Sequence, residues 1–283
     1  MMHALPGAAT TSAGAMNVIS ALLEQRTGQQ IAANRAYRID STLKPLLREL
    51  ELTSLDQLVV HLVKSRNGGL GDRVVDALLN QETSFFRDAM VLDQVADAAE
   101  ALQAEIPYRR LRVWSAGCSR GQEPLSLAML LAERGFSALG SFELVATDVS
   151  SSALARARAG RYSQFEIQRG LPVRRMMQWF DNVDGEWAAK SELLRRIQFR
   201  QQNLAADPPP PPGKFDLVLC RNVLLYFSQP LRQRVFSLFA DAVRPGGLLV
   251  LGAGETVIGQ TSAFQPSDRF RGFYQQVGGG SAD

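Results

Sequence analysis

One segment near the middle of the chain constrains its fold more than any other. Residues 111–116 are a short apolar run, a turn that contains Gly117 and Gly121 follows, and helical periodicity extends from about Gln122 to Arg134. A buried strand that passes through a glycine-containing turn into a helix is the repeating unit of α/β domains. The segment therefore predicts a sheet that needs further strands beside the first one.

The chain beyond this segment supplies those strands. Apolar runs at 142–146, 215–220 and 248–252 alternate with helical stretches near 150–159 and 230–243. Strands that alternate with helices predict a mostly parallel sheet with helices packed against it.

Residues from about 163 to 202 interrupt this alternation. The segments 170–172 and 183–185 have turn composition, and 196–201 is a possible strand. We therefore predict an inserted small β subdomain at about 163–202. The five prolines at 208–212 then predict a stiff, extended connection into the next strand.

Residues ahead of the sheet have a different period. Apolar side chains recur at helical spacing, as at Val18, Ile19, Leu22 and Leu23, and again from 55 to 63. This periodicity predicts a small all-helical N-terminal domain. The predicted organisation is a disordered tail at 1–15, a helical domain at 16–87, an α/β domain at 88–277 that opens with a helix at 88–104, and a disordered tail at 278–283.

Composition excludes several functional classes. The 283 residues are 46% hydrophobic with a formal net charge of +3, which is too small an excess to predict binding to nucleic acid. The two cysteines, Cys118 and Cys220, lie far apart and near no histidine, so we expect neither a disulfide nor a metal site. No apolar run approaches the roughly 18 to 20 residues that span a bilayer, so we expect no membrane insertion and a cytoplasmic location.

Two candidate cofactor-binding features follow the first two strands. Ala116 and Gly117 begin the glycine turn, which lets the backbone approach a ligand closely, and Asp148 ends the next apolar run. A carboxylate at that strand tip can accept hydrogen bonds from both hydroxyls of a ribose. The turn lacks the third glycine of a dinucleotide-binding motif, so a nicotinamide cofactor fits poorly.

The segment after the strand at 215–220 is a third candidate. It begins with Arg221 and Asn222 and contains Tyr226, which together offer a guanidinium, an amide and a phenol. The run Asp207-Pro208-Pro209 superficially matches the Asp-Pro-Pro-Tyr signature of amino-group methyltransferases. No aromatic residue follows it, and it precedes a strand instead of ending one, so we interpret the match as coincidental.

The sequence resembles the chemotaxis receptor methyltransferases, the CheR family, over residues from about 17 to 277. The resemblance is carried by an ordered set of motifs, each weak alone and highly specific together. These are Glu82 to Asp88, the Ser119 to Pro124 turn ending in Gln-Glu-Pro, Asp148, Asn203-Leu204, and Cys220 to Val223 with Tyr226-Phe227. The resemblance implies a Rossmann-like domain that binds S-adenosylmethionine and releases S-adenosylhomocysteine.

The resemblance also implies roles for individual residues. Arg87 would lie near the methionine carboxylate of the cofactor, Glu123 would hold its amino group, Asp148 would hold its ribose, and Tyr226 would face the transferred methyl. Tyr226 and Arg87 are thus the predicted catalytic residues. The predicted cofactor-binding residues are Gln81, Thr83, Arg87, Ala116, Gly117, Glu123, Asp148, Asn203, Leu204, Arg221 and Asn222.

Two positions depart from the usual family pattern. Gln81 stands where the family commonly has asparagine, which keeps an amide, and the segment 252–255 reads Gly-Ala-Gly-Glu instead of Gly-His-Ser-Glu.

The function implied by the resemblance is methylation of glutamate side chains on the cytoplasmic helices of methyl-accepting chemotaxis receptors, by a monomeric enzyme. The family uses a basic helix against acidic receptor surfaces. Arg38, Lys44 and Arg48 fall within an arc of about 120° if residues 37–49 are helical. They are the predicted docking residues, although a merely solvated helix face would have the same pattern.

Two other functions fit the same residues. One is a regulatory module that binds the cofactor without turnover, and the other is a methyltransferase with a nucleic acid or small molecule as acceptor. Retention of Arg87, Asp148, Asn222 and Tyr226 argues against the first, and the near-neutral charge argues against a nucleic acid.

Overall fold

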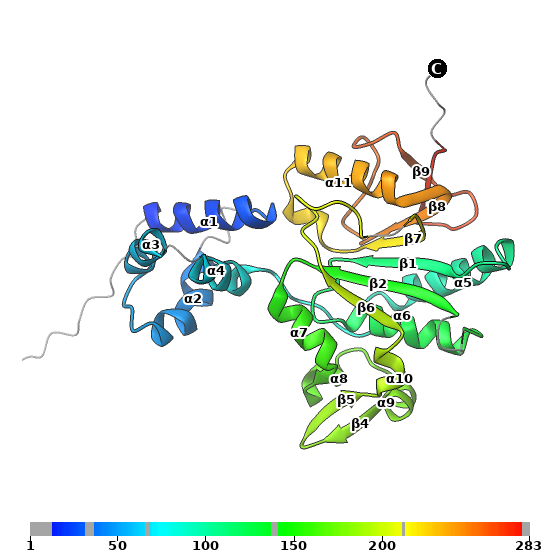
Figure 1. Cartoon of the computed structure of the whole chain (residues 1–283), viewed down its shortest axis with the longest axis horizontal. Coiled ribbons are helices and arrows are strands. Elements are labelled where there is room, and N and C mark those ends of the chain that lie inside the picture. Colours follow the sequence, from blue (N-terminus) through cyan, green and yellow to red (C-terminus); the bar gives the residue numbers. More distant parts are fainter. Residues whose placement is uncertain (1–12, 32–36, 66–67, 137–140, 211–212, 279–283) are drawn as a thin grey trace, which may run out of the picture. The chain divides into compact units, whose positions relative to one another are not determined.

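The structure is a computed structural model that describes residues 13–31, 37–65, 68–136, 141–210 and 213–278. The chain divides into two compact units, Met1–Asn80 and Gln81–Asp283 (Figure 1). This division precedes the boundary predicted after residue 87, because Phe85 and Phe86 are buried in the hydrophobic core of the second unit.

The first unit is helical, as predicted. Its helices are α1 (Ala13–Thr27), α2 (Tyr37–Glu49), α3 (Leu55–Lys64) and α4 (Gly69–Leu78). Their apolar faces share one core that includes Ile19, Leu43, Leu58 and Val74. The predicted disordered tail at 1–15 extends too far, because α1 begins at Ala13 and Ala15 is buried. The rest of that tail, residues 1–12, and residues 279–283 of the predicted C-terminal tail lie outside the described residues.

The second unit contains a seven-stranded sheet with the strand order β6-β2-β1-β7-β8-β10-β9. The strands are β1 (Leu111–Ala116), β2 (Phe142–Asp148), β6 (Ile197–Gln201), β7 (Phe215–Cys220), β8 (Val243–Leu251), β9 (Phe264–Pro266) and β10 (Tyr274–Gln276). Strands β6, β2, β1, β7 and β8 are parallel, and β10 is antiparallel to both neighbours. The mostly parallel sheet was thus correctly predicted, whereas the two short strands β9 and β10 were not.

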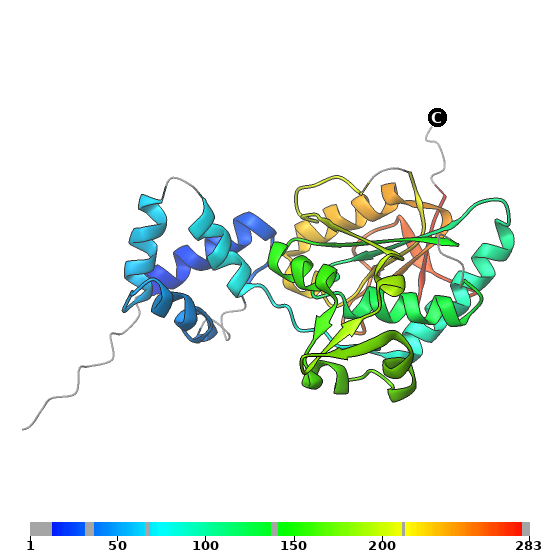
Figure 2. The same ribbon diagram turned by 60° about the horizontal axis from the view of Figure 1, so that its bottom comes forward.

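Alternate side chains of the strands build two separate cores. On β1, Leu111 and Val113 belong to one core, and Trp114 and Ala116 belong to the other. The first core is completed by α5 (Ala89–Glu105), α6 (Gln122–Glu133) and α7 (Ser151–Ala159), and the second by α11 (Gln229–Ala242) (Figure 2). Both faces of the sheet are therefore covered, as strands with apolar side chains on both faces require.

The predicted insertion is present as a second sheet with the strand order β3-β5-β4. Its elements are β3 (Arg161–Tyr162), α8 (Gln164–Gln168), α9 (Val173–Trp179), β4 (Phe180–Val183), β5 (Glu186–Ala189) and α10 (Ser191–Leu194). The predicted range of about 163–202 extends too far, because β6 pairs in parallel with β2 and belongs to the large sheet.

The topology places three turns at one edge of the large sheet. Because β1, β2 and β7 are adjacent and parallel, the segments after Ala116, Asp148 and Cys220 all start at their carboxyl ends. Open α/β sheets bind ligands at this edge.

Candidate active site

The turn after β1 is held against the end of β2. The backbone N–H groups of Gly117 and Cys118 both donate to the carbonyl of Thr147, at 2.8 and 2.9 Å. Gly117 has a φ of +78°, and a Cβ atom there would lie 2.5 Å from Cγ2 of Val223. Glycine is therefore required at this position for two reasons: the backbone conformation is left-handed, and the loop after β7 approaches too closely for a side chain.

Asp148 joins the first turn to the second. Its Oδ2 accepts from the backbone N–H of Ser119 at 2.7 Å, and its Oδ1 accepts from that of Ser150 at 2.9 Å. Ser150, not Asp148, is the N-cap of α7, where its hydroxyl accepts from Ala153 N–H. The half-buried Asp148 carboxylate is thus fixed at the sheet edge by two backbone amides.

Gln81 belongs to the same group. Its side-chain amide donates to Ser150 Oγ at 3.1 Å and accepts from Arg120 Nε at 3.3 Å, while its carbonyl accepts from Ser119 Oγ at 3.1 Å. The segment that follows carries Thr83, which is half-buried, and Arg87, which is exposed. The linker predicted to reach the cofactor is therefore anchored to the same turns as Asp148.

Arg221 and Glu123 form a second group. The Arg221 side chain is only 2% exposed and donates to Glu123 Oε2 at 2.9 Å, to Asp88 Oδ2 at 2.6 Å and to the Arg87 carbonyl at 2.9 Å. The other oxygen of Glu123 accepts from Ser115 Oγ at 2.8 Å. Arg221 is a predicted cofactor-lining residue, and the structure shows that its guanidinium binds protein groups and orients the Glu123 carboxylate.

The segments after β7 and β6 hold the remaining predicted residues. Asn222 has a φ of +60°, and Tyr226 ends the short 3-10 helix η2 (Leu224–Tyr226), where it is half-buried against the second core. After β6, Leu204 packs on that same core, and Asn203 Oδ1 accepts from Ala205 N–H at 3.0 Å.

The carboxylate of Asp207 accepts from Asn203 N–H at 2.7 Å. This bond closes a local turn ahead of β7, as expected for a coincidental Asp-Pro-Pro match.

Sequence reasoning missed three residues that shape the site. Ser119 and Ser150 connect Gln81 to Asp148, and Glu255 accepts from the backbone N–H of Asn222 at 2.8 Å. Each lies within a turn that directly follows a strand, and Ser119 and Glu255 also lie in segments that the family resemblance covers, although no role was assigned to them.

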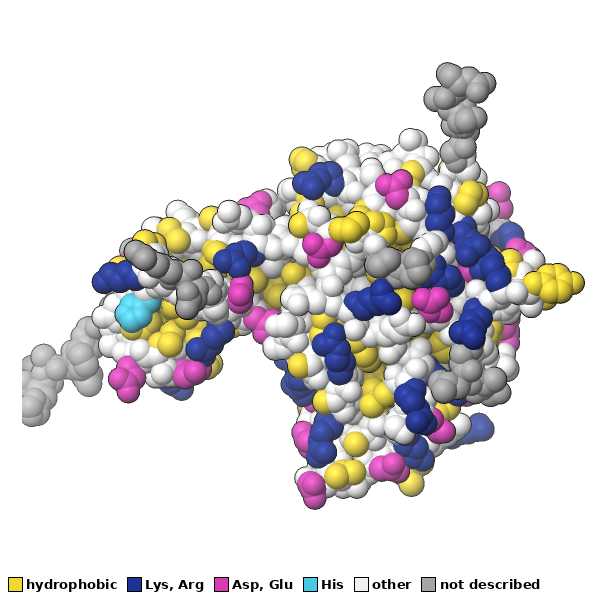
Figure 3. Space-filling model, in the orientation of Figure 1, with side chains coloured by type: hydrophobic (Ala, Val, Ile, Leu, Met, Phe, Trp, Pro, Cys, Tyr) yellow, Lys and Arg dark blue, Asp and Glu magenta, His cyan; other side chains and the backbone are white. Residues whose placement is uncertain are grey.

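The predicted docking residues lie in the other unit, on α2. Arg38, Lys44 and Arg48 are exposed, whereas Ile39 and Leu43 on the same helix are buried. Lys44 lies 3.7 Å from the carboxylate of Asp40. On the face drawn in Figure 3, basic and acidic side chains are interspersed, as expected from the small net charge.

The cysteines near the site are inert by burial. Burial raises the pKa of both Cys118 and Cys220 well above the usual thiol range, and nearby carboxylates, Asp148 and Glu123 for Cys118, add to the effect. A thiol with a raised pKa stays protonated at neutral pH and reacts slowly. We expect a thiol-reactive chromogenic reagent to find almost no reactive cysteine in the native protein at pH 8 and both after unfolding; rapid native labelling would contradict their burial.

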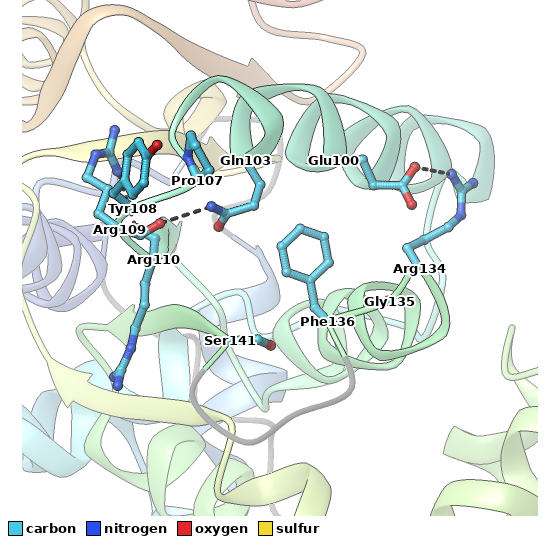
Figure 4. A pocket seen from close by; sticks show the side chains of 10 residues that line it. All are labelled: Glu100, Gln103, Pro107, Tyr108, Arg109, Arg110, Arg134, Gly135, Phe136 and Ser141. Atoms are coloured by element: carbon cyan, nitrogen blue, oxygen red, sulfur yellow. Dashed lines mark hydrogen bonds and ion pairs between the residues drawn. The ribbon is translucent and has the colours of Figure 1, made fainter.

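A hollow of about 620 Å³ lies elsewhere, between α5 and the end of α6 (Figure 4). The amide of Gln103 binds the carbonyls of Ile106 and Arg109 there, and Glu100 pairs with Arg134. None of the predicted site residues lines it. Within the described ranges, no group of three or more His, Cys, Asp or Glu residues could hold a metal ion, and no helix is long and apolar enough to cross a membrane.

Comparison with known proteins gives a consistent result. A family model described as "CheR methyltransferase, SAM binding domain" matches residues 81–272. The chain is 38% identical over 252 residues to a chemotaxis protein methyltransferase of Vibrio parahaemolyticus, which covers 87% of this chain and 90% of the relative. It is 38% identical over 242 residues to chemotaxis protein methyltransferase 1 of Pseudomonas aeruginosa (83% and 87%), and 32% identical over 240 residues to that of Escherichia coli (84% and 82%).

Proposed function

The chain belongs to the CheR methyltransferase family, and on that premise we propose that it methylates glutamate side chains on the cytoplasmic helices of methyl-accepting chemotaxis receptors. The methyl donor is S-adenosylmethionine. The observation that carries the choice of acceptor is the loop after β7, which begins with a buried Arg221 bound to Glu123 and leads to Tyr226, in place of an Asp-Pro-Pro-Tyr strand tip.

The groups at the sheet edge fit this cofactor. Asp148 at the end of β2 and Glu123 in the first turn of α6 supply two carboxylates, one suited to ribose hydroxyls and the other to an ammonium group. Each is fixed by protein donors, so neither needs to reorganise on binding. We assign Glu123 to the methionine amino group, Asp148 to the ribose, and Arg87 to the methionine carboxylate. Gln81, Thr83, Asn203, Leu204 and Asn222 would complete the binding site.

Methyl transfer to a carboxylate requires few catalytic groups from the protein. Bound S-adenosylmethionine supplies a methyl group activated by its sulfonium charge. A glutamate carboxylate with an ordinary pKa of about 4.3 is already ionised at neutral pH, so it needs no general base. The chain has only two histidines, His3 and His61, and neither lies in the turns at the sheet edge. Its residues need only hold the carboxylate in line with the methyl and exclude water.

Tyr226 is the residue we assign to hold the acceptor. Its phenol can donate a hydrogen bond to a carboxylate oxygen, and because this bond also stabilises the ground state, its role is positioning. Tyr226→Phe should lower kcat roughly tenfold, because an acceptor carboxylate that is held less well in line with the methyl reacts more slowly. S-adenosylhomocysteine affinity, measured by calorimetry, should stay within a few fold.

Tyr108→Phe is the matched control, because the Tyr108 side chain is fully exposed and lies outside the site. Unchanged turnover in Tyr226→Phe would remove Tyr226 from the assignment.

Esterification has a direct electrostatic consequence for the acceptor. Each methyl ester removes one negative charge from a packed helical surface, which reduces repulsion between neighbouring helices and biases their signalling state. The exposed basic side chains Arg38, Lys44 and Arg48 of α2 support docking to an acidic receptor surface.

One labelling experiment tests the proposal. The protein is incubated with methyl-labelled S-adenosylmethionine and receptor membranes, and the label is then tested for release as volatile methanol in mild base. Alkali-labile label on the receptor supports glutamate esterification. Alkali-stable label would favour another acceptor, and cofactor binding without transfer would favour a regulatory module.

A further inference from the structure

The loop after β7 is fixed by a single carboxylate that no predicted role includes. Glu255 Oε1 accepts from the backbone N–H groups of Val223 and Leu224, at 2.8 and 2.7 Å. Its Oε2 accepts from those of Asn222 and Gly252, both at 2.8 Å. A carboxylate has about four acceptor positions, so these four bonds account for its full capacity. Any influence of Glu255 on the reaction is therefore exerted through the backbone it binds.

The adjacent parallel strands make this contact possible. Cys220 at the end of β7 is in register with Leu251 at the end of β8, so the two following segments start side by side. The second segment turns back at once, because Glu255 N–H donates to the Gly252 carbonyl at 2.9 Å. The turn carries the Glu255 side chain back over the loop after β7.

Gly252 fits closely into the same arrangement. A Cβ atom at this position would lie 2.8 Å from both the backbone nitrogen of Asn222 and Oε2 of Glu255. It would also lie 2.9 Å from the side-chain nitrogen of Asn222. The loop and the carboxylate therefore leave no room for a side chain at position 252.

The bound backbone sets the conformation of two predicted site residues. Asn222 has a φ of +60°, which is uncommon for a residue with a side chain and needs support from its surroundings. The 3-10 helix η2 starts at Leu224, one of the amides that Glu255 binds, and Tyr226 N–H donates to the Val223 carbonyl at 3.2 Å. The position of the Tyr226 ring thus depends on where Glu255 holds the preceding residues.

We infer that Glu255 is a positioning residue for methyl transfer, which acts by holding Asn222 and Tyr226 in place through their backbone. The inference rests on the proposed role of Tyr226. Glutamine has nearly the shape of glutamate, but it replaces one acceptor oxygen by an NH₂ group that would face two backbone N–H donors. Glu255→Gln should therefore release part of the loop while the core around it stays packed.

The first readout is local and needs neither cofactor nor acceptor. Hydrogen exchange of the amides of residues 222–224, followed by mass spectrometry, should become at least about tenfold faster in Glu255→Gln, while exchange in β1 stays unchanged. Glu166→Gln is the matched control, because Glu166 also binds backbone, at Ser163, but lies in the inserted subdomain. Unchanged exchange at 222–224 would overturn the inference.

The second readout separates positioning from a general loss of stability. With labelled cofactor and receptor membranes, kcat of folded Glu255→Gln should fall roughly tenfold, as in Tyr226→Phe. If Glu255 acts through Tyr226, the double variant should be about as slow as the slower single variant, because the second change removes an interaction that is already lost. Two independent losses that multiply in the double variant would overturn the inference.

Gly252→Ala displaces the same loop by a different route, so it tests the inference if Glu255→Gln does not fold. It should give the same fast exchange and the same coupling to Tyr226→Phe, and normal exchange together with normal turnover would overturn the inference. Failure of the proposed function is distinguishable, since wild-type protein would then yield no alkali-labile ester.

Discussion

Replacing Arg221 with methionine is expected to lower the free energy of unfolding by about 3–5 kcal/mol and to weaken S-adenosylhomocysteine binding at the same time. The Arg221 guanidinium is the buried counterion of Glu123, whose side chain is only 15% exposed. Methionine fills similar space but leaves that carboxylate without its cationic partner. Because Glu123 is the residue assigned to the cofactor's amino group, its displacement should appear in binding as well as in stability.

Urea unfolding and calorimetry measure the two effects. Arg161→Met is the matched control, because Arg161 pairs with Glu186 at 2.8 Å while both side chains are 40% or more exposed. Loss of such a surface pair should change stability by no more than about 1 kcal/mol. If Arg221→Met retained both stability and cofactor affinity, the proposed role of the Arg221–Glu123 pair would be wrong.

Gly117→Ala should also lower both the stability of the protein and its affinity for S-adenosylhomocysteine. A left-handed backbone costs a residue with a side chain about 1–2 kcal/mol, and crowding against Val223 should add about 1–3 kcal/mol. Relief of that crowding would move the turn after β1. S-adenosylhomocysteine affinity should therefore fall about tenfold or more, because small displacements of binding groups have large effects.

Two further variants separate the causes. Gly185→Ala introduces the same backbone strain, since Gly185 has a φ of +81°, but no atom lies within 4 Å of the added Cβ. It should be destabilised by the backbone cost alone and bind cofactor normally. Val223→Ala combined with Gly117→Ala should recover part of the lost affinity; no recovery would show that steric contact with Val223 is not the cause.

The parts of the fold that were predictable are those encoded locally. The segment 111–134 predicted the strand, the turn and the helix of β1 and α6 at nearly their observed bounds, because its periodicity changes within a few residues. Strand β6 was assigned to the insertion because it lies at the edge of the large sheet, where it is only partly buried and has no continuous apolar run. Strands β9 and β10 have three residues each, too few for a pattern.

The candidate site was likewise predictable only in part. Family motifs predicted that Asp148, Glu123 and Arg221 belong to one site, but not how they interact. The bond between Arg221 and Glu123 joins residues 98 positions apart, and that between Glu255 and Asn222 depends on the pairing of β7 with β8. A sequence shows neither the burial of a guanidinium nor the number of amides that reach one carboxylate.

The division of the chain after Asn80 has a consequence for how such enzymes can diversify. The segment that carries Thr83 and Arg87 belongs to the sheet unit, where Phe85 and Phe86 are buried and Gln81 is bonded to the turns beside Asp148. All residues assigned to the cofactor therefore lie in one contiguous stretch of chain, and the residues assigned to docking lie in another. Under the proposed function, changes in α1 to α4 would alter which receptor is bound and would leave the residues assigned to methyl transfer unchanged.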